Sequence, residues 1–199
     1  MINQATLIKP VLKVCSLILL VFGLLMAVPL LMAIIYNTGN SRAFASALAL
    51  TVTLAACGWL LSRSYRMNML TPRQMFLITT SSWLMISLTG ALPFLLIPGF
   101  CDVTDAVFES VSGLTTTGST VLVGLDDMAH DILVWRSMLQ WIGGLGVIGM
   151  AVAILPFLKV GGMRLFQTES SDWSDKTTRS GTMVTMIIYV YIILTFLCA

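Results

Sequence analysis

Long apolar runs separated by short polar stretches dominate this chain of 199 residues. A membrane-spanning helix needs about 20 mostly apolar residues, and apolar runs cover residues 11–35, 43–61, 75–97, 132–158 and 182–199. Only 10% of the residues are charged, against about 25% in soluble domains, so polar side chains are too few to cover a water-soluble globule. The sequence therefore predicts an all-α integral membrane protein without a soluble domain of its own.

The positions of Lys and Arg predict the orientation of this protein. All basic residues except Arg42 and Arg136 fall in the N-terminal segment, in residues 62–73 or in residues 159–180. The segment between the third and fourth runs has no basic residue and carries Asp102, Asp105, Glu109, Asp126, Asp127 and Asp131. Because basic loops stay in the cytoplasm, we expect a cytoplasmic N-terminus and an extracytoplasmic acidic segment, which would enrich cations nearby.

Residues 98–131 are too apolar in their centre for a plain exposed loop. Asp102 or Thr104 as a cap, with Asp105 in the first turn, predicts a helix over residues 103–114. At 1.5 Å per residue this helix is about 18 Å long, roughly half of a hydrocarbon core of about 30 Å. Residues 115–120 are β-branched, hydroxylic or Gly, and in extended form they would climb back about 20 Å. The pattern predicts a re-entrant pore loop.

Non-helical backbone at membrane depth is tolerated only where protein encloses it or where it lines a watery cavity. A ring of backbone carbonyls can replace the hydration shell of a cation, and Gly118 permits the torsions that turn successive carbonyls to one side. The helix would also aim its partially negative C-terminus at the same cation. We therefore predict a K+ selectivity filter at Thr115, Thr116, Thr117, Gly118 and Ser119; the alternative is an ordinary extracellular loop with a Thr-rich turn.

Three motifs resemble the Trk/Ktr/HKT superfamily of potassium transporters, and specifically the TrkH-type uptake subunits of bacteria. They are Phe108-Glu109-Ser110-Val111-Ser112-Gly113-Leu114-Thr115-Thr116-Thr117-Gly118-Ser119-Thr120, then Trp135-Arg136-Ser137 with Gln140-Trp141-Ile142-Gly143-Gly144-Leu145-Gly146, and finally Leu155-Pro156 with Gly161-Gly162-Met163-Arg164-Leu165-Phe166. That family repeats a helix–pore loop–helix unit four times, sometimes after two extra N-terminal helices.

The resemblance implies a division of the chain. Residues 1–70 would be the extra two-helix hairpin, 71–160 the first repeat, 161–181 a cytoplasmic linker and 182–199 the truncated first helix of a second repeat. Because only one pore loop is present, we expect either a fragment of a four-repeat protein or a truncated product. The first alternative function is a non-conducting membrane scaffold, and Na+/K+ symport ranks below it.

The resemblance also implies K+ transport as the function and K+ as the transported ion. It implies a multi-pass protein of the bacterial inner membrane that forms a homodimer when full length. A cytosolic nucleotide-binding regulatory subunit would contact residues 163–180. The partner of the apolar surface is the lipid bilayer, and neither an organic cofactor nor nucleic acid is expected.

Several residues near the predicted filter have a structural interpretation. Glu109 is expected to bond backbone donors behind the loop rather than the ion. Arg136 is expected to snorkel or to pair with a carboxylate of the acidic segment. Gly143, Gly144, Gly146 and Gly149 favour close helix packing over a gating hinge.

An intramembrane hydrolase is the remaining alternative, because Ser112 precedes Gly113 as in some serine proteases. His130, the single histidine, lies in the loop rather than on a neighbouring span, so no base is positioned. We therefore predict that the chain is not an enzyme.

Overall fold

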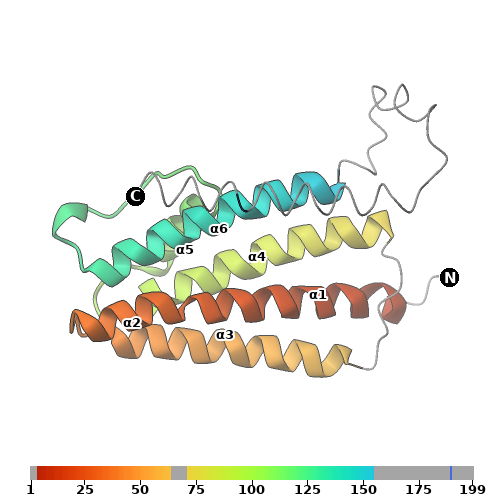
Figure 1. Ribbon diagram of the computed structural model, residues 1–199, viewed down its shortest axis with the longest axis horizontal. Coiled ribbons are helices and arrows are strands. Elements are labelled where there is room, and N and C mark those ends of the chain that lie inside the picture. The colour runs from red at the N-terminus through yellow and green to blue at the C-terminus, as the bar shows by residue number, and fades with distance from the viewer. Residues whose placement is uncertain (1–3, 64–70, 155–188, 190–199) are drawn as a thin grey trace. The chain divides into compact units, whose positions relative to one another are not determined.

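The computed structural model describes residues 4–63, 71–154 and Tyr189, and within them every regular element is helical (Figure 1). The elements are α1 (Gln4–Leu25), α2 (Ala27–Ile35), α3 (Ser41–Ser62), α4 (Pro72–Leu96), α5 (Val103–Leu114), the 3₁₀ turn η1 (Leu125–Asp127) and α6 (His130–Ile154). The chain divides into two compact units, Met1–Gly144 and Leu145–Ala199, and the packing described below belongs to the first. The predicted linker over 161–181 and the last apolar run, apart from Tyr189, lie outside the described residues.

The first predicted span is interrupted, and the cause is Pro29. Proline has no N–H and its ring crowds the carbonyl four residues earlier, which here belongs to Leu25, the last residue of α1. The chain therefore forms a turn at Met26, whose N–H bonds the Gly23 carbonyl at 3.1 Å, and continues as α2. The break thus falls three residues before the proline.

Three helical segments are long and apolar enough to cross a membrane: Ile8–Ile35, Ser41–Ser62 and Arg73–Leu96. No more than a third of each apolar window is buried inside the protein, so most of their Leu, Ile and Val side chains face outward. Such broad apolar exposure suits lipid and not water. α6 is 25 residues long, about 37 Å, and its crossing of the membrane stays a prediction.

Helices α1, α3 and α4 lie side by side (Figure 1), and small residues let the first two approach closely. A Cβ added to Gly58 of α3 would overlap the Ser16 hydroxyl of α1. α4 begins at a capping box, in which Thr71 and Gln74 exchange side-chain and backbone hydrogen bonds.

A buried aromatic cluster lies where these helices meet α5 and α6. Trp135 of α6 is fully buried and packs against Phe22 of α1, with ring centroids 5.5 Å apart. Phe44 of α3 and Phe94 of α4 belong to the same core. This cluster holds the N-terminal half of α6, which carries the contacts to the predicted filter.

Candidate functional site

α5 has the bounds that the sequence predicts, Val103–Leu114. Asp102 occupies the N-cap position, but its side chain makes no capping hydrogen bond, so the predicted cap is wrong in that detail. At the other end, the Thr115 N–H bonds the Val111 carbonyl at 2.8 Å, which completes the last turn.

The segment after α5 begins as a tight turn. Thr116 has φ +58°, and the N–H groups of Thr117 and Gly118 both reach back to the Ser112 carbonyl, at 3.0 and 3.3 Å. A left-handed residue after a helix allows such bonds to satisfy its last carbonyls. The prediction of an extended chain from Thr115 onward is therefore wrong for Thr115 and Thr116, because these two residues complete the helix end.

The backbone of the five predicted filter residues alternates in the sign of φ. Thr115 and Thr116 have φ −77° and +58°, Gly118 has φ +76°, and Thr117 and Ser119 are negative. On a strand successive peptide groups point to opposite sides, whereas alternating right- and left-handed residues let like groups point the same way. Such a backbone can turn consecutive carbonyls toward one ligand.

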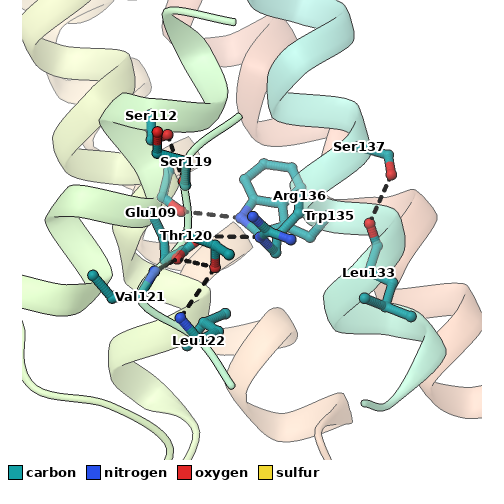
Figure 2. Close-up of polar contacts among 11 residues, drawn as sticks. Glu109, Ser112, Ser119, Thr120, Val121, Leu122, Leu133, Trp135, Arg136 and Ser137 are labelled. Carbon is teal, nitrogen blue, oxygen red and sulfur yellow. Dashed lines mark hydrogen bonds and ion pairs between the residues drawn. The ribbon is translucent and has the colours of Figure 1, made fainter. Parts of the chain in front are cut away.

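Most carbonyls of this segment have no partner within the described residues. Those of Thr115, Thr116, Thr117 and Gly118 accept no hydrogen bond there. The Ser119 carbonyl instead accepts a hydrogen bond from the Ser112 hydroxyl at 2.6 Å, which ties Ser119 to α5 (Figure 2). The side chains add one link of their own, 2.9 Å between the hydroxyls of Thr115 and Thr117.

Glu109 holds the two residues that directly follow the predicted filter, Thr120 and Val121 (Figure 2). We call this set of contacts the Glu109 brace. One of its oxygens, Oε1, accepts the Val121 N–H at 2.7 Å and also the Thr120 hydroxyl. The other, Oε2, pairs with Arg136 Nε at 2.8 Å, with the Glu109 side chain 0% and that of Arg136 16% exposed. The predicted bond of Glu109 to a backbone donor and the predicted pairing of Arg136 with a carboxylate are both confirmed.

α6 supports the loop through small residues and one close backbone approach. A Cβ on Gly143 would lie 1.9 Å from the Leu114 carbonyl oxygen, so the helix end of α5 rests on α6 at a point where only Gly fits. A Cβ on Gly113 would lie 3.0 Å from that of Leu139. Close packing is thus confirmed for Gly143, and it stays a prediction for Gly144, Gly146 and Gly149.

α4 holds both neighbouring helices through its own carbonyls. The Ser110 hydroxyl of α5 donates to the Ser87 carbonyl at 2.7 Å, and the Trp135 indole of α6 donates to the Gly90 carbonyl at 3.0 Å. A Cβ on Gly90 would lie 2.6 Å from the Ser110 hydroxyl. Sequence reasoning missed Ser110, Trp135 and Gly90 as supports, because their partners lie on other helices.

The residues of the hydrolase alternative have other partners. Ser112 donates to the Ser119 carbonyl, and the His130 ring stacks on Tyr36 with centroids 4.6 Å apart. A nucleophile needs its base within hydrogen-bond reach, and neither residue is engaged in that way. Among the described residues no group of three or more His, Cys, Asp or Glu could hold a metal ion.

Residues 40–199 match the sequence model of the TrkH family, described as cation transport proteins. The chain belongs to this family. The match covers the half-length helix, the loop after it and α6, and it extends through the residues beyond the described part.

Named TrkH-family proteins resemble nearly the whole chain. The potassium uptake protein TrkI of Halomonas elongata is 45% identical over 191 residues, covering 96% of this chain and 39% of that protein. Escherichia coli TrkH is 39% identical over 196 residues, with 96% and 40% coverage. The chain thus spans about two fifths of the length of these relatives.

A solved structure supports the fold as well as the family. The potassium transporter TrkH of Vibrio parahaemolyticus matches with a TM-score of 0.78 at 33% identity, over 95% of this chain and 38% of that one. The all-α membrane fold predicted from the sequence is therefore confirmed. This TrkH-family chain is related to ion transporters, which agrees with the prediction that it is not an enzyme.

Proposed function

We propose that this chain contributes to a K+ permeation pathway, with Thr115, Thr116, Thr117, Gly118 and Ser119 forming one wall of its selectivity filter. The observation that carries the proposal is the alternation of φ over these residues, with four carbonyls left unbonded within the described part. A dehydrated K+ ion needs a ring of such oxygens. The TrkH-family relatives are named potassium uptake proteins, which favours K+ as the ion.

The position of α5 supports the same proposal. Its C-terminus ends at Leu114, directly before the unbonded carbonyls, and a helix C-terminus carries a partial negative charge that favours a cation. Because the loop is braced by Glu109 and not by the ion, its shape can exist before the ion arrives, so little ordering is needed on binding.

The surrounding assembly is proposed on the resemblance. Residues 1–70 form an N-terminal hairpin, 71–160 the first of four repeats around one pore, 161–181 a cytoplasmic linker and 182–199 the start of the next repeat. The N-terminus is cytoplasmic in the bacterial inner membrane. A cytosolic nucleotide-binding subunit regulates the pathway, and two copies of the complete protein associate.

The test uses a chimera, in which this chain replaces the matched segment of Halomonas elongata TrkI. The chimera is expressed in cells that lack their own K+ uptake, with unaltered TrkI as the positive control. We expect growth at low K+ and uptake that prefers K+ over Na+. Growth with TrkI but not with the chimera would contradict the proposal and would favour a non-conducting scaffold.

The decisive variant is Gly118→Ser, which restricts the torsions that aim the carbonyls. Its matched control is Gly124→Ser, because Gly124 has nearly the same φ, +74°, outside the proposed filter and with nothing within 4 Å of an added Cβ. Both variants bear the same backbone strain. We expect Gly118→Ser alone to lower the K+ over Na+ uptake ratio, and equal ratios in the two variants would exclude a filter at Gly118.

A further inference from the structure

The outer end of α6 buries a carboxylate that the filter contacts do not use. Asp131 is 0% exposed, and its Oδ2 accepts from the Asn40 side-chain amide at 2.9 Å. Its Oδ1 is also buried, and it has no hydrogen-bond partner among the residues that the structure describes. The sequence analysis placed Asp131 in the acidic segment and did not predict that its side chain is buried.

Asp131 heads the buried face of α6 that supports the loop. Residues four apart share one face of a helix, and Trp135, Leu139 and Gly143 follow Asp131 at this spacing, all of them buried. These are the residues that contact the Gly90 carbonyl, Gly113 and the Leu114 carbonyl. A displacement at Asp131 is therefore carried along a rigid helix for about 18 Å, as far as the end of α5.

Both members of the Asp131–Asn40 pair give up a more favourable arrangement. An apolar side chain at the head of this face would avoid the desolvation of a carboxylate, and the best-attested use of such buried polar groups is to specify register. Asn40 is the N-cap residue of α3, yet its side chain makes no capping bond, although Asn is among the best caps. A second contact joins the start of α6 to the connection between α2 and α3, because the His130 ring stacks on Tyr36.

We propose that Asp131 and Asn40 are positioning residues that set the axial register of α6, so that the N-terminal helices α2 and α3 support the filter through α6. A slip of one residue would turn α6 by about 100° and shift it 1.5 Å, which would move Arg136 and Gly143 from their partners. The proposal rests on the proposed function for its transport readout, but not for its structural readout.

The variants separate register from stability. Asp131→Leu removes the buried carboxylate and fills its space, so the melting temperature is expected to stay near that of the parent chimera. Asn40→Asp places two carboxylates together. The exchange Asn40→Asp with Asp131→Asn restores one donor facing one acceptor. The matched control is Asp126→Leu, which removes the same charge from an exposed residue of the same segment.

Two readouts are applied to the TrkI chimera. The first is the K+ over Na+ uptake ratio, which we expect to fall about threefold to tenfold in Asp131→Leu and in Asn40→Asp, to recover in the exchange and to be unchanged in Asp126→Leu. The second is the yield of a disulfide between Gly113→Cys and Leu139→Cys, whose Cβ atoms lie close in this register. This disulfide yield should fall in Asp131→Leu and in Asn40→Asp, and it should recover in the exchange.

The outcomes decide the two proposals separately. A stable Asp131→Leu variant with the parent's uptake ratio and disulfide yield overturns the register role, and so does an exchange no better than Asn40→Asp alone. Should Asp131→Leu fail to fold, the comparison of Asn40→Asp with the exchange still decides. If no chimera transports K+, the proposed function fails, while the disulfide yields continue to test the register.

Discussion

Replacing Glu109 with Gln should loosen the Thr115–Ser119 loop while leaving the helices around it folded. The Gln side chain keeps an oxygen for the Val121 N–H but offers Arg136 no carboxylate. The lost bond is charge-assisted, 2.8 Å long and formed with a fully buried carboxylate, and such bonds contribute about 1.5–3 kcal/mol. Glu109→Ala removes every acceptor of the brace, and breaking a buried pair in this way costs about 3–5 kcal/mol.

A double-mutant cycle measures the coupling directly. Glu109→Gln, Arg136→Met and the double variant are unfolded with SDS in mixed micelles, and their K+ over Na+ uptake ratios are measured in the TrkI chimera. Because the two side chains are in contact, we expect a coupling free energy of about 0.5–3 kcal/mol and a lowered ratio in both single variants. Strictly additive changes in stability, or an unaltered ratio together with full uptake in Glu109→Gln, would refute the brace.

Three other predictions follow from contacts and exposure. Gly143→Ala should displace the end of α5 and abolish uptake, because its Cβ would meet the Leu114 oxygen at 1.9 Å. In the control Gly23→Ala the added Cβ meets only the side chains of Thr51 and Val52, both at 3.2 Å, and uptake should be retained. Burial and nearby carboxylates raise the pKa of Cys101, so a membrane-impermeant maleimide added outside should label it more slowly at pH 7.5 than a free surface thiol and faster as the pH rises; labelling only from the cytoplasmic side would reverse the predicted orientation. Single cysteines at residues 110–118 should be shielded from bulk water in the TrkI chimera, and full exposure along this range would contradict a re-entrant loop.

The helices and part of the brace could be predicted from local sequence. Apolar length gave the three candidate spans to within a few residues, and Asp102, Asp105 and Leu114 marked a short helix whose bounds the structure repeats. Glu109 and Arg136 were expected to find partners because charges at membrane depth are rare and usually paired. In each case the information that predicts the feature lies in the residue itself or within one helical turn of it.

Other features depend on segments far apart in the chain. The burial of Asp131 requires Asn40, 91 residues away, and the role of Trp135 requires the Gly90 carbonyl, 45 residues away. The turn at Thr116 was also missed, since a β-branched residue is among the least expected at positive φ. Pattern and propensity carry no information about such pairings, which only the packed helices create.

The strain at Thr116 connects these observations. A β-branched residue at φ +58° costs about 1–3 kcal/mol and persists only where its surroundings over-determine it. Here the surroundings are the two N–H bonds to the Ser112 carbonyl, the Ser112–Ser119 link and the Glu109 brace.

Weakening the brace should therefore let Thr116 relax toward negative φ. This change ends the alternation of φ along the loop and turns the Thr116 carbonyl away from the neighbouring carbonyls. In a K+ pathway that change would lower ion discrimination before it closed the route, because a disordered ring of oxygens still admits hydrated ions. A Glu109→Gln variant that lost uptake at an unchanged K+ over Na+ ratio would show that the brace supports the pore as a whole and not the shape of this loop.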